Sequence, residues 1–195
     1  YGPGFILDKL CGLSFRISSQ SFYQVNATQT EVLYNEAIRL ANLTGAETVI
    51  DAYCGTGTIG LVAARRGAAR VIGVDSVPSA IRDAANNARH NGVENAEFVT
   101  QDATAFMKEL AASEERPQPL VLLMDPPRAG STPEFLEAAT SLAPERIVYI
   151  SCNPATQARD VRQLVESGYE VRAIRPVDMF PHTHHVENVV KLVRR

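Results

Sequence analysis

A cysteine at the end of a hydrophobic run is the residue of this sequence best suited to covalent chemistry. Cys152 lies in the segment Ser-Cys-Asn-Pro, where Pro154 suits the first position of a helix and Asn153 suits the helix cap. Partial positive charge at a helix start lowers the pKa of a nearby thiol, and the thiolate is the nucleophilic form. We therefore predict that Cys152 is a nucleophile with a lowered pKa. The alternative is a small, buried and unreactive cysteine.

A rigid corner follows another hydrophobic run, in the segment Asp125-Pro-Pro-Arg128. Two consecutive prolines fix φ and remove two amide donors, so the corner is stiff and open. Such a corner can present Asp125 to a flat base, whereas the alternative is a turn in which the aspartate caps local amides. Arg128 is a candidate for stabilising negative charge on a substrate oxygen.

A glycine-rich loop at 51–60, Asp-Ala-Tyr-Cys-Gly-Thr-Gly-Thr-Ile-Gly, predicts a nucleotide-like cofactor. Gly55 and Gly57 permit a sharp turn close to a ligand. Asp75, at the tip of the next strand-like run, is placed to accept the ribose hydroxyls of either NAD or S-adenosylmethionine. Asp51 favours S-adenosylmethionine, because a carboxylate attracts its cationic amino-acid portion and repels a pyrophosphate. The alternative is a tight turn that binds nothing.

A glutamate stands at the start of the last strand-like run, after the segment Phe-Pro-His-Thr-His-His-Val. These histidines lack the partner ligands and spacing of a closed zinc site, so we expect no metal here. If the last strand runs antiparallel beside the strand that ends at Cys152, Glu187 neighbours Cys152 and Asp125 lies one strand further, because adjacent strands are ~4.8 Å apart. We predict that Glu187 is a base in the same pocket. The alternative is an exposed glutamate.

The apolar pattern that positions these residues is that of an α/β protein. Helical periodicity runs over 28–45, and strand-like runs then alternate with helical segments. The strand-like runs are 48–51, 71–75, 97–99, 120–125 and 147–150, and the helical segments begin near residues 58, 78, 103, 133 and 154. The final runs, 169–176 and 187–193, are joined without room for a helix and must be antiparallel. We predict a doubly wound, mostly parallel seven-stranded sheet whose last strand is antiparallel.

Size and composition limit the remaining possibilities. A chain of 195 residues with 45% hydrophobic content can bury one core. We expect 1–26 to be the β-rich edge of a truncated chain and 27–195 to be the catalytic domain. No apolar run reaches the ~20 residues that cross a bilayer, and no secretory signal begins the chain, so we expect a cytoplasmic protein, a monomer without membrane contact. The formal net charge is -3, whereas a protein that binds nucleic acid by itself usually carries a basic surface.

Five segments together resemble the bacterial RNA uracil-5-methyltransferases, which modify 23S ribosomal RNA or transfer RNA. They are 21–26, 51–57, 125–128, 151–154 and 180–187, and the likeness covers nearly the whole chain. The resemblance implies the Rossmann-like fold of class I S-adenosylmethionine-dependent methyltransferases. It also implies that Cys152 adds to carbon 6 of uracil and that Glu187 acts as the base.

The resemblance extends to the binding residues. Cofactor contacts carry over to Gln24, Tyr53, Thr58, Asp75, Asp102 and Asp125, and the glycine loop adds Asp51, Gly55 and Gly57. Asp125 and Arg128 are predicted to bind the substrate. The chain departs from many relatives at Thr58, where they have Asn, and at Asp75, where they have Glu.

Relatives usually carry an N-terminal RNA-binding β-barrel domain, and some carry a four-cysteine iron–sulfur site. Both are missing here, so we expect RNA to be held mainly by a missing N-terminal domain and no metal to bind this chain. We expect ribosomal RNA in preference to transfer RNA, with the target uridine flipped out of its stack.

Three other functions stay open. Methyltransferases that act on amino groups of adenine or cytosine also use an Asp-Pro-Pro corner, but an aromatic residue stands where this chain has Arg128. A module could bind the cofactor and RNA yet be inactive without its missing domain. An NAD dehydrogenase would satisfy the glycine pattern alone.

Overall fold

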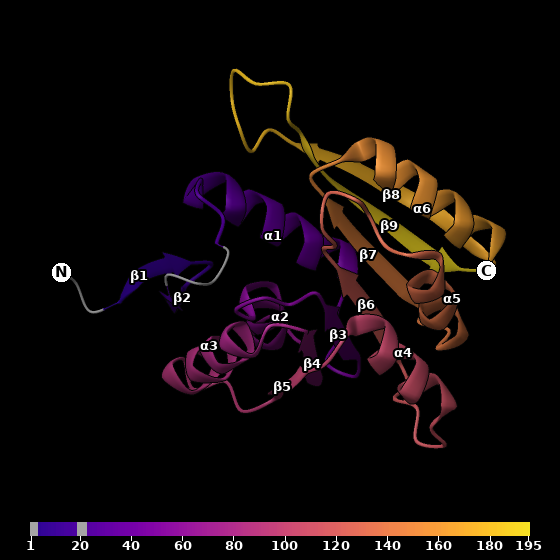
Figure 1. Cartoon of the computed structure of the whole chain (residues 1–195), viewed down its shortest axis with the longest axis horizontal. Helices are drawn as coiled ribbons and strands as arrows, with labels where there is room; N and C mark the ends of the chain where they lie inside the picture. The colour runs from indigo at the N-terminus through magenta and orange to yellow at the C-terminus, as the bar shows by residue number, and fades with distance from the viewer. Residues whose placement is uncertain (1–3, 19–22) are drawn as a thin grey trace.

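The computed structural model describes residues 4–18 and 23–195, and its main feature is a sheet with helices packed on both faces (Figure 1). The strands of this sheet are β3 (Thr48–Ala52), β4 (Arg70–Asp75), β5 (Ala96–Thr100), β6 (Leu120–Met124), β7 (Arg146–Ser151), β8 (Tyr169–Val177) and β9 (Glu187–Arg194). Their order is β5-β4-β3-β6-β7-β9-β8. The strands from β5 to β7 are parallel, and β9 is antiparallel to both β7 and β8. The predicted fold class is confirmed.

The helices begin where the sequence predicts them. They are α1 (Ala27–Ala41), α2 (Thr58–Arg65), α3 (Pro78–His90), α4 (Ala103–Ala112), α5 (Pro133–Ser141) and α6 (Pro154–Glu166). Three of them start on proline, whose fixed φ suits a helix and whose missing N–H group is not needed in the first turn. Side chains of Asn26, Asp102, Thr132 and Asn153 cap α1, α4, α5 and α6. Prolines and caps therefore made these boundaries readable from sequence.

Alternate strand residues divide the core between the two faces of the sheet. Val49 and Val121 pack in one buried cluster with side chains of α1, α2 and α3. Ile50 and Leu122, their neighbours in sequence, pack in a second cluster with side chains of α4, α5 and α6. Because side chains of a strand point alternately to opposite faces, a continuous apolar run fills both clusters.

A separate antiparallel hairpin, β1 (Phe5–Leu10) and β2 (Leu13–Ser18), precedes α1. Its two-residue turn has φ of 53° at Cys11 and 80° at Gly12. Positive φ at both positions is what a type I′ hairpin turn requires. The predicted β-rich start is therefore present, although its residues 1–3 and 19–22, including part of the predicted 21–26 segment, lie outside the described residues.

The hairpin packs as part of the main core. The Asn87 Oδ1 atom on α3 accepts a hydrogen bond of 2.8 Å from the backbone N–H of Arg16, and Phe15 joins the cluster that contains α1 and α2. The hairpin therefore shares a buried cluster with α1 and α2, and the domain boundary at residue 27 stays a prediction. Among the described helices, none has the length and apolar character needed to span a membrane.

Candidate active site

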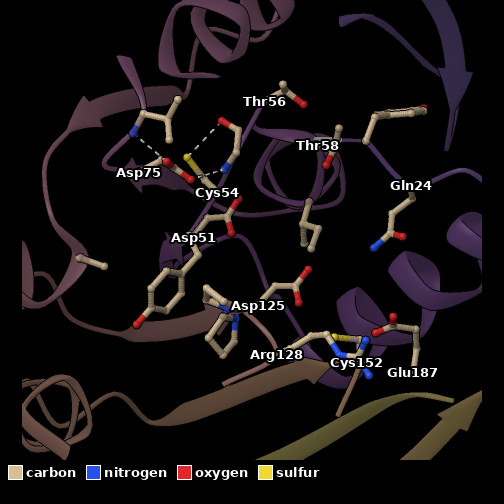
Figure 2. A pocket seen from close by; sticks show the side chains of 18 of the residues that line it. Gln24, Asp51, Cys54, Thr56, Thr58, Asp75, Asp125, Arg128, Cys152 and Glu187 are labelled. Atoms are coloured by element: carbon tan, nitrogen blue, oxygen red, sulfur yellow. Dashed lines mark hydrogen bonds between the residues drawn. The ribbon is translucent and has the colours of Figure 1, made fainter. Parts of the chain in front are cut away.

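A cavity of about 780 Å³ lies at the carboxyl ends of the parallel strands (Figure 2). Open α/β sheets bind ligands at this edge, where the strand order reverses direction, here between β3 and β6. All the residues predicted to act in catalysis or binding line the cavity except Gly57. These are Gln24, Asp51, Tyr53, Gly55, Thr58, Asp75, Asp102, Asp125, Arg128, Cys152 and Glu187. Their common location is a feature of the structure, and their roles stay predictions.

The ladder between β7 and β9 brings Cys152 and Glu187 together. Ser151 pairs with Asn188 at the last rung, so the next residue on each chain segment faces the other across the strand ends. Figure 2 shows the sulfur of Cys152 beside the carboxylate of Glu187. Cys152 is half-buried, and Glu187 is only 4% exposed. The predicted juxtaposition of these two side chains is therefore confirmed.

The electrostatic surroundings of Cys152 differ from the prediction. Burial raises the pKa of its thiol, and the carboxylates of Glu187 and Asp125 raise this pKa further. The guanidinium of Arg128 acts in the opposite direction without reversing the shift. The prediction of a lowered pKa is wrong for the free protein, because it counted the helix start but neither the burial of the thiol nor the two carboxylates across the cavity.

Asp125, which is half-buried, and Glu187, which is buried, are two carboxyl groups of the cavity with raised pKa values. Burial raises the pKa of Asp125 to about 8, and the neighbouring Glu187 and Asp51 carboxylates contribute to that shift. Burial also raises the pKa of Glu187. In the part of the chain that the structure describes, no hydrogen bond to either group opposes these shifts. Both groups therefore gain from a positive charge placed in the cavity.

Asp51 is held at the base of the cavity by the start of α2. It is 2% exposed, and its Oδ2 atom accepts a hydrogen bond of 2.9 Å from the backbone N–H of Gly60. A Cβ atom on Gly60 would lie 2.7 Å from the same oxygen, so only glycine leaves room for this carboxylate. Burial raises the pKa of Asp51 to about 7 despite the hydrogen bond.

Asp75 shapes the glycine loop as well as lining the cavity. Its Oδ2 atom accepts from the N–H of Gly55 at 2.9 Å, and its Oδ1 atom accepts from the N–H of Val77 at 2.9 Å. Gly55 has a φ of 54°, and no atom lies within 4 Å of where its Cβ would be. The loop therefore leaves open space beside Gly55 for a ligand.

Gly57 has a packing role in the structure, and its predicted cofactor contact stays a prediction. It does not line the cavity but is the residue before α2, with a φ of 77°. A Cβ atom there would lie 2.7 Å from the ring of Phe98 and 2.9 Å from the Cβ of Ala84. The glycine is needed because the loop passes closely over α3 and β5.

The remaining predicted cofactor residues are anchored by their neighbours. Tyr53 has a φ of 63°, and its ring centroid lies 5.2 Å from that of Phe135. The Thr58 hydroxyl lies 3.0 Å from the Tyr34 hydroxyl. The Asp102 carboxylate accepts from the N–H of Ala105 and caps α4. Gln24, just before α1, reaches into the same cavity (Figure 2).

The charges of the lining fit a cationic ligand. Carboxylates come from Asp51, Asp75, Asp102, Asp125 and Glu187, and they outweigh the guanidinium of Arg128 and the imidazole of His185. Buried carboxylates are stabilised by a positive partner and repel a pyrophosphate. S-adenosylmethionine, which carries sulfonium and ammonium groups, therefore fits this lining, and NAD does not.

Several lining residues had no role in the sequence analysis. They include Tyr23, Tyr34, Thr56, Ile59, Ser76, Val77, Ala103 and Thr183. Tyr34 gives no local signal, because it reads as one more apolar position of a helix. Val77 could have been found from its place two residues after Asp75, at the same strand end.

The histidine segment and the other cysteines show no metal site. Within the described ranges, no group of three or more His, Cys, Asp or Glu side chains is arranged to hold a metal ion. The rings of His184 and His185 lie 4.2 Å apart. Burial raises the pKa of the Cys54 and Cys11 thiols, and Cys11 lies in the hairpin turn, away from the cavity lining.

Comparison with known sequences finds a match to the family model of the tRNA (uracil-5-)-methyltransferases over residues 8–195. A relative from Halalkalibacterium halodurans is 50% identical over 192 residues, which are 98% of this chain and 41% of the relative. A relative from Lactiplantibacillus plantarum is 50% identical over 194 residues, which are 99% of this chain and 42% of the relative. Both are named uncharacterized RNA methyltransferases. The chain thus spans about two fifths of the length of these curated relatives.

Comparison with solved structures also finds methyltransferases. The Pyrococcus abyssi tRNA (uracil-54, C5)-methyltransferase, solved in complex with S-adenosyl-L-homocysteine, is 38% identical with a TM-score of 0.84. The match covers 99% of this chain and 45% of that one. An S-adenosylmethionine-dependent methyltransferase from Agrobacterium tumefaciens is 18% identical with a TM-score of 0.76, over 100% of this chain and 72% of that one, which is a likeness of fold alone.

Proposed function

The chain belongs to the tRNA (uracil-5-)-methyltransferase family, and from that premise we propose that it transfers a methyl group from S-adenosylmethionine to carbon 5 of a uridine in RNA. The observation that carries this proposal is the meeting of Cys152 and Glu187 at adjacent strand ends. Both side chains face the cavity that the glycine loop also lines.

Cys152 begins the reaction in this proposal. Its thiolate adds to carbon 6 of uracil, and the electron pair of the C5–C6 double bond moves toward oxygen 4, so carbon 5 becomes nucleophilic. When bound, S-adenosylmethionine supplies the electrophilic methyl group that carbon 5 takes, and the electrons of the broken S–CH3 bond stay on its sulfur. Glu187 then removes the remaining proton from carbon 5, the double bond reforms, and the thiolate leaves carbon 6.

The shared location of the thiol and the carboxylate supports this division of roles. A methyl group that adds to one face of carbon 5 leaves the hydrogen of that carbon on the other face. If the methyl group enters opposite the sulfur, the hydrogen lies on the sulfur's side of the ring. Glu187 stands beside Cys152 and is therefore placed to take that hydrogen. Its raised pKa suits a group that must hold a proton after taking it.

The residues proposed to hold the cofactor have polar capacity left over. Each oxygen of Asp75 accepts one backbone N–H and keeps a lone pair for a ribose hydroxyl. Asp51 and Asp125 offer negative charge to cationic groups, and Gly55 leaves the approach open. Gln24, Tyr53, Thr58 and Asp102 complete the proposed contacts.

The same charges bear on how Cys152 becomes a thiolate. Its pKa is raised by burial, Glu187 and Asp125. A cationic ligand beside Asp125 would neutralise one of these carboxylates, and Arg128 already opposes them. Arg128 is also the proposed donor to the oxygen that gains negative charge when the thiolate adds.

The identity of the RNA is the finer part of the proposal. We keep ribosomal RNA as the first candidate and transfer RNA as the alternative, since the solved relative at 38% identity acts on transfer RNA according to its name. In this proposal the segments 125–128 and 180–187 recognise a uracil ring. Both RNAs contain uracil, so these segments do not select one RNA over the other.

The test is to trap the covalent intermediate. The protein is mixed with S-adenosylmethionine and RNA that contains 5-fluorouridine, whose fluorine at carbon 5 cannot leave as a proton. We expect a protein–RNA complex by intact mass, and we expect Cys152→Ser to abolish it. With ordinary uridine, Glu187→Gln should accumulate the methylated adduct and lower turnover by on the order of 100-fold or more.

Two outcomes would count against this function. A complex that survives Cys152→Ser would remove the nucleophile assignment. Cofactor binding without methylation of any RNA would favour a second function, a cofactor-binding module that needs further protein. The chain's span of two fifths of its relatives' length supports keeping this second function.

A further inference from the structure

The loop that carries Arg128, residues 125–131, is held along one polar face of α6. The carbonyl oxygen of Arg128 accepts two hydrogen bonds, from Asn153 Nδ2 and from Thr156 Oγ1, each at 3.1 Å. Asn153 and Thr156 lie three residues apart and therefore on the same side of the helix. The helix that follows Cys152 thus directly holds the backbone of Arg128.

Arg159 and Asp160 hold the rest of this loop one turn further along α6. Arg159 Nη2 donates to the carbonyl oxygens of Ala129 at 3.0 Å and Ser131 at 3.2 Å. Asp160 Oδ2 accepts from the backbone N–H of Ser131 at 2.8 Å and from the hydroxyl of Tyr149 at 2.7 Å. The loop, α6 and β7 therefore meet at a single carboxylate.

Asp160 is a buried aspartate that is paired with Arg159 and hydrogen-bonded to the loop. It is 1% exposed, and Arg159 forms an ion pair with it at 2.7 Å. Between them, Gly130 has a φ of 79°, and a Cβ atom there would lie 2.6 Å from both Arg159 Nη2 and Asp160 Oδ2. The loop backbone is thus pressed against this pair without room for a side chain.

The side chain of Arg128 connects this loop to the cavity. Figure 2 shows its guanidinium beside the sulfur of Cys152 and the carboxylate of Glu187. The charged groups that face the thiol are Glu187 on β9 and Asp125 and Arg128 on the loop, and Arg128 is the one that favours the thiolate. A shift of residues 128–131, the part of the loop that α6 holds, would move the Arg128 guanidinium away and leave the thiol facing the carboxylates of Glu187 and Asp125.

We propose that Asp160, with Arg159, is a positioning residue that fixes loop 125–131 on α6 and thereby keeps the Arg128 guanidinium beside Cys152. The pair touches neither the substrate nor the cofactor in this proposal. The pair acts through Arg128. The proposal rests on the proposed function only in taking the Cys152 thiolate as the nucleophile.

The test measures the thiol itself, without RNA or cofactor. The rate of Cys152 alkylation by iodoacetamide is followed against pH by mass spectrometry of the peptide that carries it. In Asp160→Asn we expect the alkylation profile to move to higher pH, and the rate at pH 8 to fall roughly threefold to tenfold. Arg128→Met should produce a similar change, and the double variant should show no further change, because Asp160 acts through Arg128.

A matched control separates positioning from stability. Glu47→Gln breaks another buried ion pair, Glu47 with Arg146 at 2.6 Å, at the amino ends of the strands, away from the cavity. It should lower the melting temperature and leave Cys152 alkylation as in the unsubstituted protein. If Asp160→Asn does not fold, Arg159→Met tests the other half of the pair, because it removes the hydrogen bonds to the Ala129 and Ser131 carbonyls. The Arg159 side chain is 59% exposed, so its loss leaves no buried cavity.

The outcomes are distinct from those of the function test. Alkylation profiles of Asp160→Asn and Arg159→Met that match that of the unsubstituted protein would overturn the positioning role. A further slowing in the double variant with Arg128→Met would also overturn it. Failure to trap 5-fluorouridine RNA would instead contradict the proposed function. It would not change what the alkylation profiles say about the positioning role of Asp160.

Discussion

Asp51 and Asp125 destabilise the protein when they are charged and no cation is bound. Burial raises the pKa of Asp51 to about 7 and that of Asp125 to about 8. An aspartate in an unfolded chain has a pKa of ~3.9. Between these values the folded state binds more protons than the unfolded state, so the free energy of unfolding falls as the pH rises from ~4 to ~8. A cationic ligand removes this penalty, which is how the site can favour such a ligand.

This argument predicts that Asp125→Asn stabilises the free protein at alkaline pH while it weakens ligand binding. At pH 8.5 we expect the variant to melt roughly 2–5 °C above the unsubstituted protein, and at pH 4.5, where the carboxyl group is already protonated, we expect little difference. Calorimetric melting across this range measures it. Asp102→Asn, at an exposed helix cap, is the control and should keep the original pH dependence. Equal pH dependence in both variants would contradict the prediction.

At the scale of elements, the sequence predicted the strands, the helix starts and the meeting of Cys152 with Glu187. Prolines at the starts of α3, α5 and α6 and apolar runs that fill two core clusters are strong local signals. Topology then places strand ends beside each other, because a final antiparallel strand next to β7 brings its first residue to the cavity edge.

The features that could not be predicted from the sequence depend on contacts between distant segments. The pKa of Cys152 depends on the burial of its thiol and on Glu187 and Asp125, which lie at the ends of two other strands. The packing of Gly57 depends on Phe98, and the hold of α6 on loop 125–131 depends on Asp160, which reads as one more helical residue. Such effects have no signature in local spacing.

The start of α2 gives a prediction at this scale. Gly60→Ala should place a Cβ atom 2.7 Å from Asp51 Oδ2 and 3.1 Å from Val71 Cγ1, so the carboxylate must move. We expect affinity for S-adenosylhomocysteine, measured by calorimetry, to fall roughly tenfold or more, because Asp51 leaves its place and its hydrogen bond to the Gly60 N–H is strained.

A second glycine serves as the control for this effect. Gly168→Ala introduces a residue at a φ of 97°, where no atom lies within 4 Å of the new Cβ. It should lower stability through backbone strain and leave ligand affinity unchanged. Equal loss of affinity in the two variants would show that Gly60 acts through general stability and not through Asp51.

At the scale of the whole molecule, charge bears on how RNA is held. The formal net charge is -3, and acidic side chains outnumber basic ones in the cavity lining. Affinity for nucleic acid comes largely from Lys and Arg that neutralise phosphates. We therefore expect the chain to supply the chemistry at a flipped uridine while other protein surface supplies most of the grip on RNA.

The RNA itself can be identified in cells that lack the gene for this protein. Mapping of 5-methyluridine in their ribosomal and transfer RNA should show the loss of a methylated site, and we expect that site in ribosomal RNA. The gene restored with Tyr169→Phe, which removes a buried hydrogen bond to the Pro144 carbonyl at the far end of the sheet, should return the modification. The gene restored with Cys152→Ser should not, because the thiolate is needed to activate carbon 5. A site lost only from transfer RNA would select the alternative substrate. Unchanged 5-methyluridine in both RNAs would contradict the proposed reaction, whatever the chain binds.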